Sequence, residues 1–395
     1  MKNFVFISPN FPTNYWKFCA ELSNNGLRVL GIGNCPYDNL AQDLRDSIHE
    51  YYKVSSLERY EEVFKAVAFF TYKYGKIDWL ESNNEYWLER DAQLRTEFNI
   101  TSGFKSHQID YIKRKSAMKA YYAKAGIPTA RYHLVKGYED AAEFAHMVGY
   151  PVVVKPDNGV GASQTYRLRN DDELHFFIDH MDENVYIMEE FVNGYVRTYD
   201  AIINSRGEPI FESGNVTPKS IMEVVNDQAE SIYYIVSDLP DKVRDAGLRT
   251  VKAFGVRSRF VHLEYFVLND DQEGLGKAGD IIGLEVNMRP AGGYTPDMYN
   301  FAYETDVYKI WADMIAFDKN TLPVDRPRRN CAFMGRRDGK AYKLDHDAIM
   351  ERYGIGMKMW GRIPDALAGA MANQMYICNF DTEEEVYRFF QELME

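Results

Sequence analysis

The first hundred residues alternate short apolar runs with helical patterns. Apolar runs typical of buried strands lie at 4–7, 28–32 and 77–80. Amphipathic patterns with a helical period lie at 13–24, 57–73 and 84–97. This alternation predicts βαβ units and a Rossmann-like α/β domain with a parallel sheet over residues 1–104.

A dinucleotide site on such a sheet needs G-x-G-x-x-G after the first strand, because glycines let the backbone approach a pyrophosphate. Residues 8–13 read SPNFPT instead. The βαβ pattern keeps an NAD-dependent oxidoreductase as an alternative function, but the missing glycines argue against it.

The middle of the chain has a different pattern. One long helix, rich in lysine and tyrosine, is predicted over 105–125 and ends at Gly126 and Pro128. Strand patterns follow at 149–155, 165–168, 185–190, 196–204, 209–214, 259–268 and 281–289, and helical patterns at 171–181, 240–254 and 304–316. This order predicts an α+β domain with mostly antiparallel sheets over residues 105–325.

The end of the chain predicts a third, smaller unit. Residues 323–330, PVDRPRRN, combine two prolines with four charges, which is typical of a linker. The C-terminal α+β unit would span residues 326–395. Thr382 and Glu385 form a capping-box pattern that predicts a final helix over 382–394.

Composition narrows the class of protein. The chain has 395 residues, 46% hydrophobic and 27% charged, which is ordinary for a soluble globular protein. Its net charge of −13 argues against broad attraction to nucleic acid or anionic membranes. Four cysteines without C-x-x-C argue against a zinc site or a disulfide framework. We therefore expect a cytoplasmic protein whose anion site is local.

Two neighbouring strand patterns place polar residues on one face. In 281–289 the apolar residues Ile282, Leu284, Val286 and Met288 alternate with Glu285, Asn287 and Arg289. In 259–268 the apolar residues Val261, Leu263, Tyr265 and Val267 alternate with His262, Glu264 and Phe266. If the two strands pair through 269–280, Glu264 lies opposite or nearly opposite Glu285.

Facing carboxylates repel each other, so a cation is expected between them. Glu264 and Glu285 with the Asn287 carbonyl are hard oxygen ligands suited to Mg²⁺, with Mn²⁺ as the alternative ion. The other interpretation is a solvated sheet face on which these residues are merely exposed.

Two further segments could bind a nucleotide. Lys155 ends the strand pattern PVVVK, and the loop after it contains Gly159, Gly161 and Ser163. Backbone N–H groups of such a loop can bind phosphate oxygens, although an ordinary hairpin turn fits equally well. The strand end at 187–194, IMEEFVNG, could offer an adenine ring an apolar slot and a backbone edge.

The order of these motifs resembles the ATP-grasp superfamily. Lys115 is followed by AKAGIPTA (123–130), GYPVVVK (149–155), MEEFV (188–192), HLEYF (262–266) and LEVNMRPAGG (284–293). The resemblance is to the branch with biotin carboxylase, carbamoyl phosphate synthase domains and carboxylate–amine ligases, and it covers residues 105–315. It implies a pre-ATP-grasp domain at 1–104 and an ATP-grasp domain with a lid at 130–190 and a core at 191–320.

The resemblance also implies roles for single residues. The ATP-binding set would be Lys115 and Lys155 on the phosphates, Gly159, Gly161 and Ser163 in the closing loop, and Glu189, Glu190, Val192 and Phe266 around adenine. The metal ligands would be Glu264, Glu285 and Asn287. Arg289, with Lys155, would be catalytic and would stabilise the transferred phosphoryl group. The ribose-binding glutamate of the family has no counterpart, because 194–197 reads GYVR.

The implied activity is an ATP-dependent ligase. It would convert a carboxylate into an acyl phosphate, which an amine then displaces. Its partners would be small-molecule carboxylate and amine substrates rather than nucleic acid or membrane, and a homo-oligomer stays open. The alternative is a nucleotide-binding regulatory module or pseudoenzyme, which would not need the arginine at 289.

Overall fold

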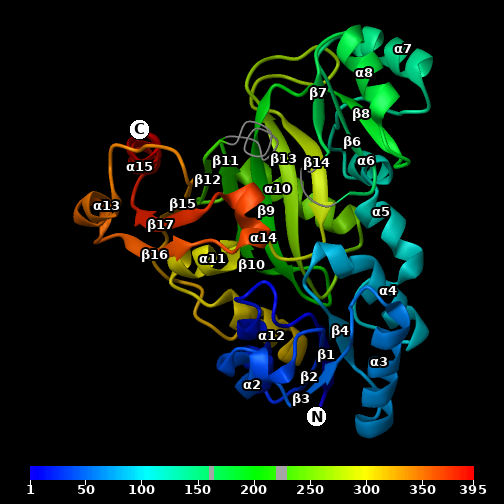
Figure 1. Ribbon diagram of the computed structural model, residues 1–395, viewed down its shortest axis with the longest axis vertical. Helices are drawn as coiled ribbons and strands as arrows, with labels where there is room; N and C mark the ends of the chain where they lie inside the picture. Colours follow the sequence, from blue (N-terminus) through cyan, green and yellow to red (C-terminus); the bar gives the residue numbers. More distant parts are fainter. Residues whose placement is uncertain (160–163, 219–228) are drawn as a thin grey trace.

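Three β-sheets organise the chain in the computed structural model, which describes residues 1–159, 164–218 and 229–395 (Figure 1). A four-stranded sheet forms the N-terminal unit, a nine-stranded sheet forms the centre, and a second four-stranded sheet forms the lid. Gly161 and Ser163 lie outside the described residues. None of the helices in the described ranges combines the length and apolarity needed to cross a membrane.

The N-terminal sheet is parallel, as the alternation predicts. Its order is β3-β2-β1-β4, with bounds Glu50–Lys53, Arg28–Gly33, Asn3–Ile7 and Trp79–Glu81. The helices of this unit are α1 (Trp16–Asn24), α2 (Gln42–Ser47), α3 (Tyr60–Tyr74) and α4 (Leu88–Glu97). Phe4 and Phe6 join one core cluster, whereas Val5 and Ile7 join another. Both faces of β1 are therefore buried, as is usual in parallel sheets.

The central sheet has the order β14-β13-β9-β11-β12-β15-β17-β16, and β10 pairs with β9. Its strands from the middle of the chain are β9 (Gly194–Ile203), β10 (Pro209–Ser213), β11 (Asn215–Thr217), β12 (Ser231–Ile235), β13 (Arg259–Leu268) and β14 (Ile281–Asn287). Three C-terminal strands, β15 (Asn330–Arg336), β16 (Met357–Arg362) and β17 (Gln374–Phe380), extend the same sheet through the β12–β15 pairing. The C-terminal residues thus continue the central sheet.

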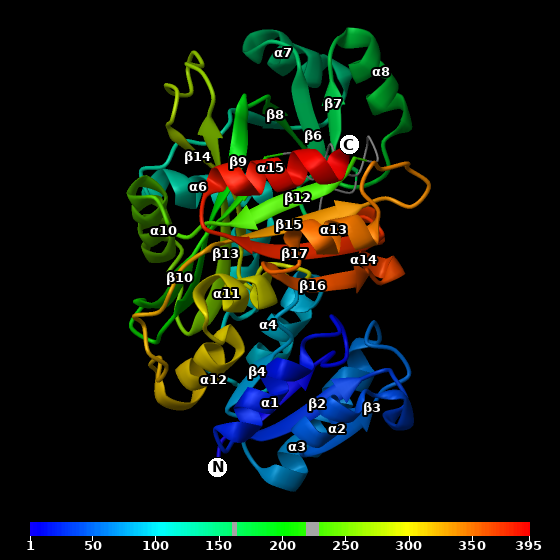
Figure 2. The same ribbon diagram turned by 90° about the vertical axis from the view of Figure 1, so that its left-hand side faces the viewer.

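Helices cover the faces of this sheet (Figure 2). They are α10 (Asp241–Ala253), α11 (Thr295–Tyr303), α12 (Val307–Phe317), α13 (His346–Tyr353), α14 (Asp365–Met371) and α15 (Glu383–Met394). α15 packs on β15 and β17 through Val386, Phe389, Phe390 and Leu393. The predicted capping box at its start is confirmed, since the Thr382 hydroxyl accepts from the Glu385 N–H and the Glu385 carboxylate accepts from the Thr382 N–H.

The lid is a small antiparallel sheet of order β5-β8-β6-β7, drawn at the top of Figure 1. Its strands are β5 (Tyr132–Leu134), β6 (Val152–Pro156), β7 (Tyr166–Leu168) and β8 (Tyr186–Glu190), and its helices are α7 (Tyr138–Val148) and α8 (Asp171–His180). One core cluster joins the two helices to β6, β7 and β8.

The single helix predicted over 105–125 is wrong. The chain forms the 3-10 turn η3 (Ser106–Gln108), α5 (Ile109–Lys113) and α6 (Lys115–Lys124), with extended backbone at Arg114. Asp157 of the lid causes the break, because its backbone oxygen accepts from the Lys115 N–H at 2.9 Å and its carboxylate accepts from the Ser116 N–H at 2.7 Å. A residue 41 positions away thus caps α6.

The strict alternation predicted for 281–289 is also wrong at its start. Glu264 pairs with Glu285, but the next pair is Tyr265 with Gly283, so Leu284 is the extra residue of a β-bulge. Ile282 therefore packs with Phe266 instead of sharing the core of Val286 and Met288. An added Cβ at Gly283 would lie 2.6 Å from the Tyr122 ring, so this position needs glycine.

Candidate active site

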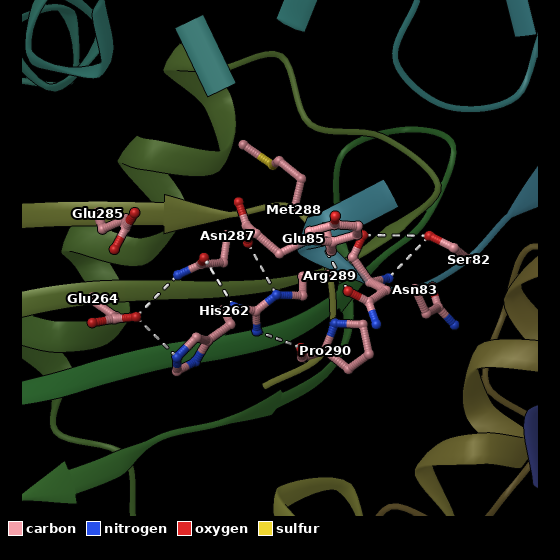
Figure 3. Close-up of polar contacts among 12 residues, drawn as sticks. Ser82, Asn83, Glu85, His262, Glu264, Glu285, Asn287, Met288, Arg289 and Pro290 are labelled. Carbon is pink, nitrogen blue, oxygen red and sulfur yellow. Dashed lines mark hydrogen bonds and ion pairs between the residues drawn. The ribbon is translucent and has the colours of Figure 1, made fainter. Parts of the chain in front are cut away.

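The predicted meeting of two carboxylates is confirmed. Glu264 on β13 and Glu285 on β14 are directly opposite each other, and His262 is opposite Asn287 (Figure 3). Both carboxylates belong to the polar face of the hairpin, away from the core formed by Leu263 and Val286. The pairing register places both acids at one point of the sheet.

Cationic side chains neutralise this pair. The Lys115 Nζ lies 2.9 Å from Glu285 Oε1, and the His262 Nε2 lies 3.2 Å from Glu264 Oε1. Asn287 Nδ2 donates to the same Glu264 oxygen at 3.0 Å. Burial favours the neutral acid, but His262 outweighs it and lowers the pKa of Glu264 below its usual range. Lowering this pKa favours the ionised form of Glu264.

His262 is part of a buried relay. Its Nδ1 lies 2.5 Å from Asp200 Oδ1, and the Thr198 hydroxyl donates to the other Asp200 oxygen at 2.5 Å. Burial favours the neutral ring, but Asp200 and Glu264 raise the pKa of His262 to about 9. Asp200 and His262 thus form a hydrogen-bonded chain that ends at Glu264. The structure shows that they orient Glu264.

The donor set fits a hard divalent cation. Among the described residues, Oε2 of Glu264 and Oε2 of Glu285 accept no hydrogen bond, whereas the Asn287 carbonyl accepts from Arg289 Nη2 at 3.2 Å. The part of the chain that the structure describes has no group of three or more His, Cys, Asp or Glu placed to hold a metal. Two carboxylates and one amide suit Mg²⁺, which takes further ligands from water and phosphates.

Two lysines, Lys119 on α6 and Lys155 on the lid strand β6, hold Glu189 of the lid strand β8. Lys155 Nζ lies 2.6 Å from Glu189 Oε2, and Lys119 forms an ion pair with the other oxygen of Glu189. Burial works against ionisation, but the two lysines lower the pKa of Glu189 to about 2. The Glu189 carboxylate, which the resemblance assigns to adenine, is thus held by lysines.

Lys119 was missed in the sequence. It lies one helical turn after Lys115 on α6, is 7% exposed, and donates to the Ala130 carbonyl at 3.2 Å. The K-x-x-x-K spacing, which puts both lysines on one helix face, was the available signal. Lys115 also donates to the Gly159 carbonyl at 3.2 Å, so the start of the glycine loop lies at the same place.

The adenine candidates lie along one strip between the lid and the central sheet. The Glu190 carboxylate accepts from the Arg131 guanidinium at 2.7 and 2.9 Å, which leaves only its backbone for a ligand. Val192 and Phe266 belong to an apolar cluster with Ala130, Leu268, Leu275 and Ile282. The β-bulge at Leu284 brings Ile282 into this cluster.

Arg289 joins the N-terminal unit to the central sheet. Its Nε donates to Glu85 Oε2 at 3.0 Å, its Nη1 to the Pro290 carbonyl at 2.9 Å, and its Nη2 to Asn287 (Figure 3). Glu85, which is 6% exposed, comes from the loop after β4. Sequence reasoning missed it, because nothing in SNNEYW (82–87) links it to a strand two hundred residues away.

A buried ion network fixes this junction. Glu81, at the end of β4, accepts from Arg95 at 2.8 Å and from Arg259 at 2.6 Å. Arg259 also donates to the Met288 carbonyl at 2.6 Å. Because these groups are almost inaccessible, the network holds the residue before Arg289 against the N-terminal sheet.

Parts of the sequence are similar to known proteins. Residues 113–196 match the family model described as carbamoyl-phosphate synthase L chain, ATP binding domain. Mouse (Mus musculus) mitochondrial carbamoyl-phosphate synthase [ammonia] is 22% identical over 302 residues, covering 70% of this chain and 18% of that protein. The L-arginine-specific L-amino acid ligase of Bacillus subtilis is 28% identical over 145 residues, covering 36% of this chain and 34% of that protein. The chain thus spans about a fifth of the length of the carbamoyl-phosphate synthases that it matches.

Solved structures resemble the whole chain. The L-amino acid ligase from Bacillus licheniformis has a TM-score of 0.73 at 16% identity, covering 99% of this chain and 96% of that one. The biotin carboxylase domain of the Hydrogenobacter thermophilus 2-oxoglutarate carboxylase, solved with MgADP and bicarbonate, has a TM-score of 0.69 at 14% identity, covering 98% of this chain and 88% of that one. These likenesses confirm the predicted fold class.

Proposed function

Because the chain belongs to the ATP-grasp superfamily, we propose that it is an ATP-dependent ligase. It converts a small carboxylate into an acyl phosphate and joins the acyl group to an amine, releasing ADP and phosphate. The observation that carries this proposal is the position of Arg289, hydrogen-bonded to Asn287 beside the facing Glu264 and Glu285. A site that only binds a nucleotide has no need for an arginine there.

Two lysines would bind the phosphates of the nucleotide. Lys115 and Lys155 are paired with Glu285 and Glu189, so each can exchange a carboxylate for a phosphate oxygen while it stays neutralised. The Ala130, Val192, Phe266 and Ile282 strip would receive the base. The start of the glycine loop lies against Lys115 and is placed to cover the phosphates.

The residues that would bind the metal ion are Glu264, Glu285 and Asn287. Bound Mg²⁺ would offset the charge of the β- and γ-phosphate oxygens. Asp200 and His262 hold Glu264 in place, and Asn287 orients Arg289 through its carbonyl. Arg289 can then follow the charge that develops on the transferred group, because its fork of donors is already fixed by Glu85 and Asn287.

The proposal also assigns a domain to each part of the chain. Residues 1–104 are the pre-ATP-grasp domain, 105–325 the ATP-grasp domain with its lid at 130–190 and core at 191–320, and 326–395 the C-terminal unit. The substrates are small molecules, and the compartment is the cytoplasm.

The test is carboxylate- and amine-dependent ADP release by the purified protein, with pooled carboxylates and pooled amines. Calorimetry should show Mg-ATP binding, and Lys155→Ala should weaken it at least tenfold without unfolding, because Lys119 still neutralises Glu189. A protein that binds no ATP at millimolar concentration contradicts the proposal. Binding without turnover on any pool would favour a regulatory module.

A further inference from the structure

The carboxyl ends of β1 and β4 lie side by side in the N-terminal sheet. The chain runs from β1 to β2 and β3 on one side, and then returns to place β4 on the other side of β1. In open α/β sheets, ligands bind where the strand order reverses in this way. The loop after β4 leaves from this point and brings Glu85 to Arg289.

Two features of this edge are unusual for a structural loop. Ser8 after β1 and Asn83 after β4 have φ of 57° and 55°, a left-handed conformation that is uncommon for non-glycine residues and is often found at functional sites. Asn83 is 2% exposed, and its buried Nδ2 has no hydrogen-bond partner among the described residues. A buried amide donor without a partner is costly, and such unsatisfied or strained positions concentrate at functional sites.

Glu85 offers a carboxylate oxygen at this edge of the sheet. Its Oε2 accepts from Arg289 at 3.0 Å, whereas its Oε1 accepts no hydrogen bond within the described part of the chain. In Figure 3, Glu85 and Asn83 lie on the opposite side of Arg289 from Glu285. Tyr15 donates to the Asn83 carbonyl at 2.7 Å and so fixes the loop against the first helix.

We propose that Glu85 binds the amine substrate as its ammonium ion and accepts a proton from it. This inference rests on the proposed ligase function. It assigns the amine to the N-terminal side of Arg289 and the acyl phosphate to the metal side.

The step balances as follows. The ammonium ion gives one proton to Glu85, and the free amine attacks the acyl carbon. The C–N bond forms, the C–O bond to phosphate breaks, and the second proton of the nitrogen leaves on the inorganic phosphate. Glu85 returns its proton to solvent.

The surroundings of Glu85 suit this role. Burial raises the pKa of Glu85, while Arg289 opposes the rise. The other charged groups that act on it are Glu285, Lys113 and Lys115. A carboxylate with a raised pKa is a better proton acceptor at neutral pH, and a positioned base contributes about a hundredfold to ten-thousandfold in rate.

The experiment compares two nucleophiles on wild type and E85Q. The carboxylate probes are the proteinogenic L-amino acids and their N-acetyl derivatives, and the amine probe is L-alaninamide, which has no carboxylate. Hydroxylamine is uncharged at neutral pH and needs no base. We expect E85Q to lose about a hundredfold or more in alaninamide ligation while hydroxamate formation stays within about twofold, because the carboxamide oxygen of the variant would still accept from Arg289.

The control is E97Q on the exposed end of α4, which should keep both rates. Equal loss of both rates in E85Q would show that Glu85 acts on acyl-phosphate formation, and unchanged rates would show no role; either result overturns the proposal. If wild type forms no hydroxamate with any probe, the ligase function fails instead.

A binding measurement tests Glu85 without a known carboxylate. Calorimetry of L-alaninamide with Mg-ADP-loaded protein should show binding to wild type and E97Q, and at least tenfold weaker binding to E85Q. Absence of binding to wild type, or equal binding to E85Q, overturns the proposal. Circular dichroism establishes that each variant is folded.

Discussion

At the scale of single residues, the candidate site consists of oppositely charged side chains that pair with one another. A bound ligand would replace one partner of a pair. Lys115 and His262 serve the facing carboxylates, Lys155 and Lys119 share Glu189, and Arg289 shares Glu85 and Asn287. Each pair is largely buried, so water cannot fully solvate a charge that loses its partner. Substituting one residue of a pair should therefore reveal the role of its partner.

Arg289 should matter more to turnover than to ATP affinity. Arg289→Ala is expected to lower kcat about a hundredfold to a thousandfold, equivalent to about 3 to 4 kcal/mol, with a smaller change in the KM for ATP. Arg289→Lys should not restore it, because an ammonium cannot replace the bidentate guanidinium. Steady-state kinetics beside Glu285→Ala checks this, and near-normal kcat in folded Arg289→Ala would reduce Arg289 to an ion-pair partner.

His262 should make stability depend on pH. Its pKa in the folded protein, about 9, lies above the unfolded value near 6.5. The stabilisation is therefore complete below about pH 6.5 and is lost as pH rises through 9, at up to about 1.4 kcal/mol per pH unit. Urea unfolding of wild type and His262→Gln from pH 6 to 10 should show that loss only in wild type. If the free energy of unfolding depended on pH in the same way in both proteins, this prediction would be contradicted.

At the scale of elements, a contact from the lid decides where α6 begins. Propensity favours one helix through Arg114, yet Asp157 takes the N–H groups of Lys115 and Ser116. The β-bulge at Leu284 is a second example, because it turns Ile282 toward the apolar cluster of Val192 and Phe266. Both irregularities place functional side chains, as local departures from ideal geometry often do.

Asp157→Ala should loosen the start of α6 and displace Lys115. Loss of a cap costs about 1 kcal/mol, and Mg-ATP affinity should fall as well, because Lys115 would no longer be fixed. Asp157→Asn keeps an acceptor for Ser116 and is the matched control. Thermal unfolding and calorimetry measure the two effects, and unchanged affinity in Asp157→Ala would separate the cap from nucleotide binding.

At the scale of the molecule, the N-terminal unit and the central sheet share the active site. Arg289 reaches Glu85, Arg259 reaches Glu81, and Lys17 pairs with Asp297 at 2.6 Å. The N-terminal sheet therefore completes the site rather than carrying one of its own, which explains why it has no glycine motif after β1.

Arg259→Leu should weaken this junction. It leaves Glu81 with Arg95 alone in a buried setting, and breaking such a network costs about 3 to 5 kcal/mol. The free energy of unfolding in urea should fall by that order, and kcat should fall because the Met288 carbonyl loses its donor. Arg257→Leu, at an exposed arginine just before β13, should change neither. Equal effects of the two variants would contradict the junction role.

The sequence by itself determined the fold class, the parallel N-terminal sheet and the pairing of Glu264 with Glu285. These features follow from period-two and helical patterns and from a short hairpin connection, all of which are local. The motif order also implies that Lys155 and Arg289 belong to one site. In the structure, Lys155 pairs with Glu189 and Arg289 donates to Asn287.

Only the tertiary structure decided the partners. Glu85, Lys119 and Asp157 act on residues that are close in space but belong to other elements, so no local pattern identifies those partners. The same is true of the C-terminal strands, which lie in the central sheet because β12 offers them an edge. Periodicity reports which face of an element is buried, whereas the identity of what it is buried against depends on how the elements pack.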